Sequence, residues 1–322
     1  MPPSVTLVLE WENALLAEMA RPIEMLNRLN RQVIDYAAAN KTDFELLIVF
    51  NSDDVSPEFV DGVIADHIDG SKWPGKIRKQ SAVGLHYYDL KNFGAQKAAS
   101  DIVLFLDSDV IPDDNWLPAL LDVFDDPDIQ FVAGNTYMAT DGFLGKCFAL
   151  TWNFPAKEDK PDLFTQGGFY ANNIAFRREF FLANPFPSED CYRGQCGQLA
   201  SNLSQKGYQT HVSGRAWVSH PAPNGLDHYI VRAIAKGYDN QYWSTRRHAG
   251  GWLAKPVGTV RRFAVGCAKV LINTVKRYPK VRVGVGYAIV AIPVGLTYQL
   301  IVLGSELFCY ARPQAIRRRF SI

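Results

Sequence analysis

The sequence predicts an α/β fold with a mixed, mainly parallel β-sheet and helices on both of its faces, because short apolar runs alternate with helical patterns. The apolar runs are continuous, which is typical of strands that are buried on both faces. The candidate strands are Val5–Leu9, Glu45–Phe50, Asp101–Leu106, Ile129–Gly134 and Ala216–His220. Of the 322 residues, 48% are hydrophobic and 21% are charged, which is enough apolar material for a large core. A coiled coil, a collagen and a disordered chain are therefore excluded.

The helices between these strands are predicted from start signals and apolar spacing. Pro22 suits the first turn of a helix, and apolar residues follow at helical spacing to about Ala39. Further helices are predicted at Asn92–Ser100, Asn115–Phe124 and Tyr192–Gln205, whereas Val55–Ile68 is helical or irregular and Gln80–Tyr88 is a candidate third strand. Ligands bind beyond the carboxyl ends of strands in such sheets. We therefore expect the residues that follow Leu9, Phe50 and Leu106 to line one site.

Charge and cysteine content exclude several classes of protein. Lys and Arg (34) nearly balance Asp and Glu (33), so no nucleic-acid partner is expected. The five cysteines form no CxxC pair and have no zinc-site spacing, which indicates reduced thiols in a cytoplasmic compartment. The N-terminus lacks the basic region of a signal peptide.

Near the C-terminus, the composition suggests contact with a membrane. Val283–Ser305 is a run of 23 residues without a charge, and about 20 apolar residues can cross a bilayer as a helix. Three alternatives stay open for this run: a helix that spans the membrane, one that lies on it, and a buried helix. Val257–Arg277 interleaves basic and apolar residues, as in a helix that lies in an anionic membrane surface or an ordinary amphipathic helix. We therefore expect a catalytic domain at residues 1–250 and membrane-associating helices at 251–322.

Two carboxylates follow the strand that ends at Leu106. In the sequence Asp107-Ser108-Asp109, two like charges lie so close that they repel unless a positive group stands between them. Oxygen ligands of this kind select Mg²⁺ or Mn²⁺, which proteins hold through one or two carboxylates together with substrate phosphates. The motif therefore predicts a divalent metal site, and the alternative is a strand-end turn with solvated acids.

Four stretches together resemble the family 2 inverting glycosyltransferases, which have the GT-A fold, a Rossmann-like nucleotide-diphospho-sugar transferase fold. They are Val5–Asn13 (VTLVLEWEN), Glu45–Asp53 (ELLIVFNSD), Lys91–Asp109 (KNFGAQKAASDIVLFLDSD), and Gly167–Arg178 (GGFYANNIAFRR) followed by Glu189-Asp190. The order and spacing of the four make a chance match improbable. The resemblance implies a nucleotide-sugar donor, with donor-binding positions at Glu12, Asn51, Asp53, Lys91, Asp107, Ser108, Gly167 and Gly168.

The same resemblance implies the metal ligands and the catalytic base. Asp109, with Asp107 and His220, would hold Mn²⁺ or Mg²⁺ against the donor diphosphate; for His220 the alternative is a strand-end histidine bonded to the backbone. Asp190 would be the general base, since an inverting transfer needs a carboxylate to take the acceptor proton. Glu189 is the competing base, and its alternative role is to cap the following helix.

Three departures from the family pattern affect what can be inferred. Glu10 stands where the family usually has Pro, and Phe50-Asn51 replaces an Asp pair, although Asn51 can still hydrogen-bond a uracil. The residues Cys191–Gly194 after the Glu-Asp pair do not match the family, so the acceptor class does not follow. The Gln-x-x-Arg-Trp motif of polysaccharide synthases is absent after His220, so a polymer-extruding channel is not expected.

The sequence as a whole predicts a membrane-associated, metal-dependent, inverting glycosyltransferase. It would move one sugar from a nucleotide donor, a UDP-sugar, to a lipid-linked or glycan acceptor at the cytoplasmic membrane face, tethered to membrane lipids by its C-terminal segment. Two alternatives stay open. A sugar nucleotidyltransferase should have a Gly-rich basic loop at Glu10–Leu16, which is missing. An inactive GT-A-like membrane binding or assembly subunit is favoured by the altered second strand and disfavoured by the retained acids.

Overall fold

The computed structural model describes residues 3–247 and 254–320, and the chain divides into two compact units. The first unit consists of Met1–Thr136, Asp159–Ser188 and Gln195–His220, and the second of Tyr137–Glu158, Glu189–Gly194 and Pro221–Ile322. This division differs from the predicted boundary at residue 250, because helices α5 (Gly142–Thr151) and α8 (Gly225–Arg247) pack against helix α10 (Val285–Ala311).

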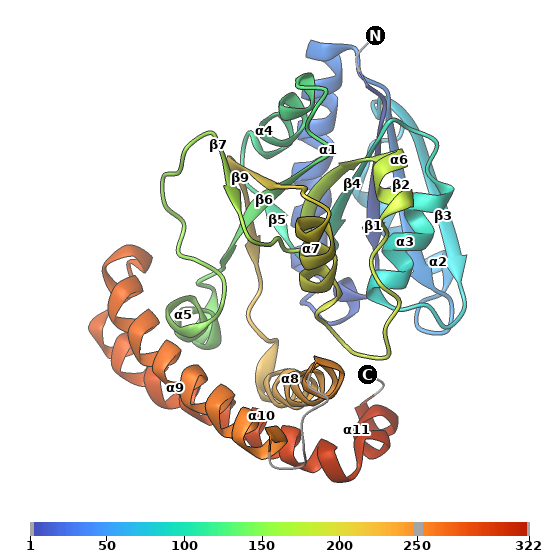
Figure 1. Cartoon of the computed structure of the whole chain (residues 1–322). Helices are drawn as coiled ribbons and strands as arrows, with labels where there is room; N and C mark the ends of the chain where they lie inside the picture. The colour runs from blue at the N-terminus through green and yellow to red at the C-terminus, as the bar shows by residue number, and fades with distance from the viewer. Residues whose placement is uncertain (1–2, 248–253, 321–322) are drawn as a thin grey trace. The chain divides into compact units, whose positions relative to one another are not determined.

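The first unit is built on one mixed β-sheet (Figure 1). Its strands are β1 (Val5–Glu10), β2 (Phe44–Asn51), β3 (Gly75–Ala82), β4 (Ile102–Asp107), β5 (Ile111–Pro112), β6 (Phe131–Met138), β7 (Leu163–Gln166), β8 (Asn173–Arg177) and β9 (Thr210–His220). The order is β3-β2-β1-β4-β8-β6-β9-β5, with β7 paired to β9. Strands β3, β2, β1 and β4 are parallel, and β8 runs antiparallel to β4. The carboxyl ends of β1, β2 and β4 therefore meet at one edge, as the sequence predicts.

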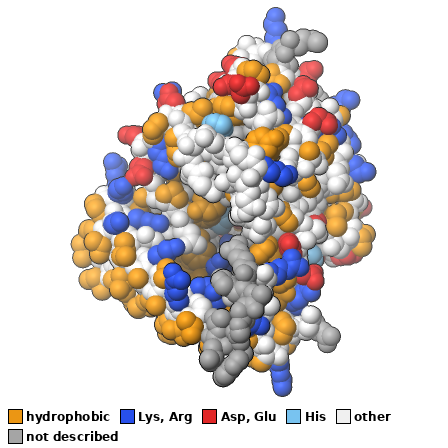
Figure 2. Space-filling model, in the orientation of Figure 1, with side chains coloured by type: hydrophobic (Ala, Val, Ile, Leu, Met, Phe, Trp, Pro, Cys, Tyr) orange, Lys and Arg blue, Asp and Glu red, His pale blue; other side chains and the backbone are white. Residues whose placement is uncertain are grey.

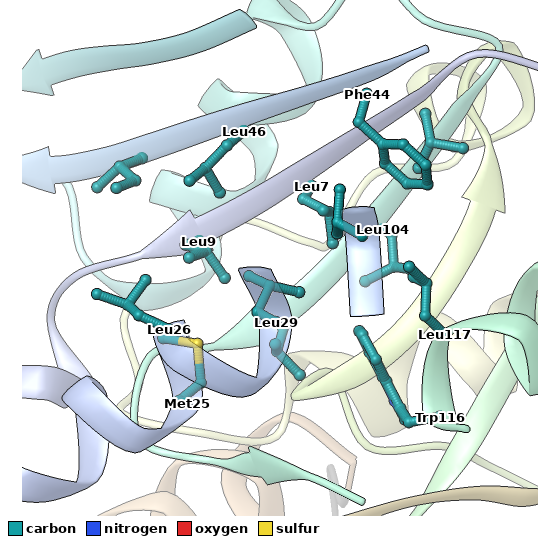
Figure 3. Close-up of a cluster of buried hydrophobic side chains, with 14 of the residues drawn as sticks. Leu7, Leu9, Met25, Leu26, Leu29, Phe44, Leu46, Leu104, Trp116 and Leu117 are labelled. Atoms are coloured by element: carbon teal, nitrogen blue, oxygen red, sulfur yellow. The ribbon is translucent and has the colours of Figure 1, made fainter. Parts of the chain in front are cut away.

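Helices cover both faces of this sheet, which confirms the predicted α/β architecture. They are α1 (Ala20–Asn40), α2 (Pro57–His67), α3 (Tyr87–Lys97), α4 (Trp116–Leu121), α6 (Arg178–Ala183) and α7 (Gln195–Gln205), with short 3-10 turns η1 (Asn13–Leu15) and η2 (Asp122–Asp125). Successive strand residues point to opposite faces. Leu7 and Leu104 pack with α1 and α4 (Figure 3), whereas Val8 and Phe105 pack in a second cluster with α3, α6 and α7.

Three predicted boundaries were wrong. The third strand is β3 at Gly75–Ala82 rather than Gln80–Tyr88, and α3 already begins at Tyr87 rather than Asn92. Among the residues that the structure describes, β3 pairs with β2 alone, at the sheet edge, and its side chains are exposed or half-buried. An edge strand therefore lacks the continuous apolar run that marks a buried one. Likewise, α7 begins at Gln195 rather than Tyr192, because the preceding residues Glu189–Gly194 belong to the second unit.

The second unit is helical. It contains α5, α8, α9 (Ala254–Val281), α10 and α11 (Pro313–Phe320). Its core includes an aromatic group, in which the ring centroids of Phe148 and Trp152 lie 4.8 Å apart and those of Trp152 and Tyr298 lie 5.0 Å apart. Within the described residues, α10 is the one helix whose length and apolar composition suffice to cross a membrane, and 28% of its most apolar stretch is buried.

Helix α3 lies unusually close to the sheet at Gly94. A Cβ atom on Gly94 would stand 2.4 Å from Cγ1 of Val8 and 3.3 Å from Cγ1 of Val49. Both valines are fully buried in neighbouring strands, so neither side chain has room to move. Only glycine therefore allows α3 to approach β1 this closely, and α3 carries residues of the candidate site.

Replacing Gly94 with Ala should lower the free energy of unfolding by about 1–3 kcal/mol, because the added methyl group overpacks the interface. Gly62→Ala is the matched control. Gly62 is exposed in the middle of α2 with no atom within 4 Å of the added carbon, and there the change should stabilise by about 0.4–1 kcal/mol. Urea unfolding of both variants measures the difference. Equal stability of the two variants would contradict the close approach.

Candidate active site

Three carboxyl groups meet at the carboxyl ends of β1 and β4. Glu10 ends β1 and lies in register with Asp107, the last residue of β4, and Asp109 follows two residues later. The exposed fractions of Glu10, Asp107 and Asp109 are only 0%, 3% and 7%. Three acids buried this deeply need positive or hydrogen-bonding partners, since an unpaired buried charge is very costly.

Helix α3 supplies the partners of Asp107. The ammonium Nζ of Lys91 lies 2.8 Å from Asp107 Oδ1, and Lys91 is completely buried. The hydroxyl of Tyr87, one helical turn earlier on the same face, donates to both Asp107 oxygens at 2.8 Å. Asn13 Nδ2 also donates to Oδ2 at 3.2 Å. Both oxygens of Asp107 are thus engaged by the protein, and Lys91 supports Asp107 from within the core.

Glu10 organises the turn that follows β1. Its Oε2 accepts hydrogen bonds from the backbone N–H groups of Glu12 (2.9 Å) and Asn13 (3.2 Å), and its Oε1 accepts one from Asn13 Nδ2 (2.8 Å). Burial and the adjacent Asp107 carboxylate raise the pKa of Glu10 well above its usual range, while Lys91 opposes the shift. The residue at the position where the family usually has Pro is therefore part of the site's hydrogen-bonded frame.

The loop that carries Asp109 is fixed by two further residues. Ser108 is fully buried, and its Oγ accepts from Ala14 N at 2.9 Å. Arg21 donates from Nε to the carbonyl oxygen of Asp109 (2.7 Å) and from Nη2 to the carbonyl oxygen of Ser219 (2.6 Å). Pairing of Ile111 with Ser219 also joins β5 to β9. These contacts bring the backbone next to His220 to the Asp109 loop. No sequence pattern singles out Arg21, because its partners are far away along the chain.

The acids fit a divalent cation whose coordination would be completed by oxygens of a bound phosphate ligand. No cluster of three or more His, Cys, Asp or Glu side chains able to hold a metal exists within residues 3–247 and 254–320, so Asp107, Asp109 and His220 do not form a ready-made cage. Mg²⁺ and Mn²⁺ need only one or two protein carboxylates when phosphates supply further oxygens. Within the protein, Lys91, Tyr87 and Asn13 bind the Asp107 carboxylate, and Asp109 lies two residues further on in the loop that Arg21 holds.

The predicted donor-binding residues Glu12 and Asn51 hold loops in place. Glu12 Oε2 accepts from the backbone N–H of Tyr87 at 2.8 Å, at the N-terminus of α3, where negative charge is favoured. Asn51 Oδ1 accepts from Asp53 N (3.2 Å) and Gly84 N (3.1 Å), so it joins the loops after β2 and β3. The amide oxygen of Asn51 is therefore already bonded within the protein, while Asp53 itself is exposed.

The Gly-Gly segment reaches the same edge of the sheet through β8. Gly167 and Gly168 follow β7, and a Cβ atom added to either glycine would meet no heavy atom within 4 Å. The backbone N–H of Asp107 donates to the carbonyl oxygen of Asn172 at 3.2 Å, just before β8. The surroundings of both glycines are thus open, and the segment after them is bonded to the Asp107 backbone.

The predicted bases Glu189 and Asp190 lie in the second unit and differ in their surroundings. Glu189 Oε2 accepts from the Tyr242 hydroxyl at 2.6 Å and pairs with Arg246, and only 15% of its side chain is exposed. Asp190 is 69% exposed and receives two hydrogen bonds from Arg317, at 3.0 and 2.8 Å. The alternative that Glu189 caps the next helix is wrong, because α7 begins only at Gln195 and α8 holds the Glu189 carboxylate.

A buried carboxylate anchors this segment to α8. Asp239 accepts hydrogen bonds from the backbone N–H groups of Tyr192 (2.8 Å) and Arg193 (3.1 Å). Burial raises the pKa of Asp239 to about 7. The hydroxyl of Tyr238 donates to the carbonyl oxygen of Asp190 at 2.8 Å. Sequence reasoning missed Asp239, because its partners are backbone groups 46 and 47 residues away.

Removing the Lys91 charge should destabilise the protein strongly. Lys91→Met keeps the length of the side chain but leaves the Asp107 carboxylate buried without its cation, which costs about 3–5 kcal/mol. Arg215→Met is the matched control: Arg215 pairs with Asp162 at 2.6 Å, both side chains are well exposed, and the loss should be below about 1 kcal/mol. Guanidinium unfolding of both variants tests this. A Lys91→Met loss no larger than that of the control would show that the buried pair is not needed.

The comparisons with known proteins agree with this geometry. The model of a family described as "Glycosyl transferase family 2" matches residues 23–183, which are 161 of the 322 residues. No curated protein matches the chain.

Among solved structures, the chain is similar to the mannosyltransferase PcManGT from Pyrobaculum calidifontis in complex with GDP-Man and Mn²⁺. The TM-score is 0.56 and the sequence identity 14%, and the match covers 98% of this chain and 88% of that one. It is also similar to S. aureus TarS 1-349 in complex with UDP-GlcNAc, with a TM-score of 0.51 and 13% identity, covering 97% and 92%.

At such low identities these two structures show the fold, which is GT-A, and the family match supplies the activity. The matched residues include α3 and β4 with its two acids, the Gly-Gly segment and β8. The chain belongs to glycosyl transferase family 2 and is a glycosyltransferase of the GT-A fold.

Proposed function

We propose that this glycosyltransferase is metal-dependent and inverting, and that it transfers one sugar from a UDP-sugar to a lipid-linked or glycan acceptor at the cytoplasmic face of a membrane. The observation that carries the proposal is the pair of buried acids, Asp107 and Asp109, at the end of β4, where the sequence places a motif for a divalent metal. Asp107 is neutralised by Lys91 within the protein, and the backbone of Asp109 is held by Arg21.

In this proposal Asp109 holds Mn²⁺ or Mg²⁺, with His220 as the second protein candidate. When bound, the metal would offset the negative charge that develops on the leaving diphosphate. Arg21 supports this role, because it donates hydrogen bonds to the carbonyl oxygens of Asp109 and Ser219. One side chain therefore holds the backbone at Asp109 and the backbone next to His220. The Mn²⁺ in the complex of PcManGT with GDP-Man favours the same chemistry.

Asp190 is the proposed general base. A base must be able to reach the acceptor hydroxyl, and the Asp190 carboxylate is mostly exposed whereas that of Glu189 is enclosed by Tyr242 and Arg246. The paired hydrogen bonds from Arg317 fix the direction of the Asp190 carboxylate without covering it. Asp190 then takes the proton of the acceptor hydroxyl as that oxygen attacks the sugar.

The proposed donor class and location have separate support. The complex of TarS with UDP-GlcNAc favours a UDP-sugar, and that of PcManGT with GDP-Man makes a GDP-sugar the alternative to be tested beside it. Membrane association is supported by the apolar helix α10 and by α9, whose seven Lys and Arg residues are accompanied by no acid. A tether of this kind would hold the enzyme where lipid-linked acceptors lie.

Changing Asp109 to Asn should remove metal-dependent donor binding. The variant keeps the shape of the side chain but loses its charge, so the affinity for UDP or GDP with Mn²⁺ should fall at least to that measured without metal. Asp114→Asn is the control, because Asp114 is 82% exposed in a pair with Arg31. Titration calorimetry with both nucleotides, with and without Mn²⁺, gives the answer. Undiminished Mn²⁺-dependent binding by Asp109→Asn would remove Asp109 from the metal site.

Changing Asp190 to Asn should slow sugar transfer by about 10²–10⁴-fold, because a general base contributes that much. Donor binding should stay unchanged, since the base acts on the acceptor. Glu189→Gln, which perturbs the neighbouring contacts with Tyr242 and Arg246, is the matched comparison and should cost less. Transfer rates from UDP-sugar and GDP-sugar panels test both variants. If Glu189→Gln is inactive while Asp190→Asn keeps the wild-type rate, the two roles are reversed.

A further inference from the structure

The exposed hydrophobic side chains of this protein gather on two helices. Of the 21 large hydrophobic residues exposed in the described part of the chain, twelve lie on α9 and α10. They are Val257, Val260, Val265, Leu271, Ile272 and Val275 on α9, and Val285, Ile289, Val290, Leu300, Leu307 and Phe308 on α10. Figure 2 shows hydrophobic side chains with Lys and Arg among them where Figure 1 places α9. We call the exposed faces of these two helices the apolar platform. A patch of this extent marks an interaction site.

The charge on the platform has one sign. α9 carries seven basic residues and no acidic one. Lys269 and Lys276 are exposed two helical turns apart along one edge of its apolar face, and Arg261 is exposed within it. Lys280, further along the same edge, pairs with Glu158 of the segment after α5. The acid of α10, Glu306, is only 1% exposed, because it pairs with Arg262 of α9. A basic and apolar surface of this kind fits an anionic lipid bilayer. A second copy of the chain fits less well, because basic residues would face basic residues.

The opposite face of α10 is covered along its length by helices that carry charges. The hydroxyls of Tyr298 and Ser305 donate to the α8 carbonyl oxygens of Arg232 (3.2 Å) and Ile234 (2.8 Å). At Gly237 the two helices come so close that a Cβ atom would stand 2.6 Å from the carbonyl oxygen of Val302. If α10 crossed a bilayer in this fold, the adjoining charged residues of α8 and α9 would enter the hydrocarbon with it, where charges are strongly disfavoured.

We propose that α9 and α10 together lie in the plane of an anionic bilayer surface, with the apolar platform at the boundary between headgroups and acyl chains, and that α10 does not cross the membrane. The lysines beside the platform reach the lipid phosphates while their stems stay among apolar groups. This inference rests on the membrane association proposed above and specifies its geometry. It also decides between the spanning, surface-bound and buried alternatives that the sequence leaves open for this helix.

The first experiment measures flotation of the full-length protein with vesicles. Binding to vesicles of phosphatidylcholine mixed with phosphatidylglycerol should exceed binding to phosphatidylcholine alone by about tenfold or more, and high salt should weaken it. The double variant Ile272→Glu and Val275→Glu should lose binding by about tenfold or more. Phe59→Glu, at a similarly exposed site on α2 of the first unit, is the matched control and should bind as wild type. Thermal melting checks that all variants fold. Unchanged binding by the double variant would overturn the platform.

The second experiment separates lying on the membrane from crossing it. Full-length protein with a tag at each terminus is expressed, and protease is added to sealed membrane vesicles. If α10 lies in the plane, both tags are cleaved from the same side. If one tag is protected, α10 crosses and the inference fails, while the membrane association of the proposed function stands. If the protein binds no vesicles at all, both fail, and the transfer assay on a soluble acceptor still tests the glycosyltransferase chemistry separately.

Discussion

The buried ion pair between Asp107 and Lys91 is the interaction on which the candidate site depends. Acids at the ends of buried strands need nearby partners, because a charge without one is very unfavourable in a protein interior. Lys91 can reach Asp107 only if α3 lies tightly on β1, and Gly94 makes that approach possible. The same helix begins at Tyr87, whose hydroxyl and backbone N–H bond Asp107 and Glu12. One helix thus holds the turn after β1 and the tip of β4 together.

A consequence of this frame is that neighbouring acids have different surroundings. Asp107 is held by Lys91, Tyr87 and Asn13, whereas Asp109 lies two residues further on in a loop whose backbone Arg21 holds. The second unit has a similar division. Glu189 is enclosed by side chains of α8, and Asp190 remains mostly exposed. Both acids of the second pair are held by an arginine, and Asp190, the proposed base, has the more exposed carboxylate.

The C-terminal helices illustrate how packing changes the meaning of an apolar segment. By length and composition alone, α10 is able to cross a membrane. Its hydrogen bonds to α8 and the pairing of Glu306 with Arg262 bind one face of it to helices with charged residues. The other face is exposed and uncharged. A helix with two such faces is suited to an interface, where water and lipid meet.

The sequence by itself determined the α/β architecture, the strands β1, β2 and β4 and the acids after β4, because strands buried on both faces must be continuously apolar and their ends mark the site. It also indicated the family, which the match to residues 23–183 confirms. It did not determine edge strand β3, the start of α3, or the roles of Tyr87, Arg21 and Asp239. Those residues act on groups 20, 88 and 47 positions away, and only the tertiary structure brings such groups within hydrogen-bonding distance. The tertiary structure also decided the state of each acid, since burial and partners depend on neighbours in space rather than on neighbours in the chain.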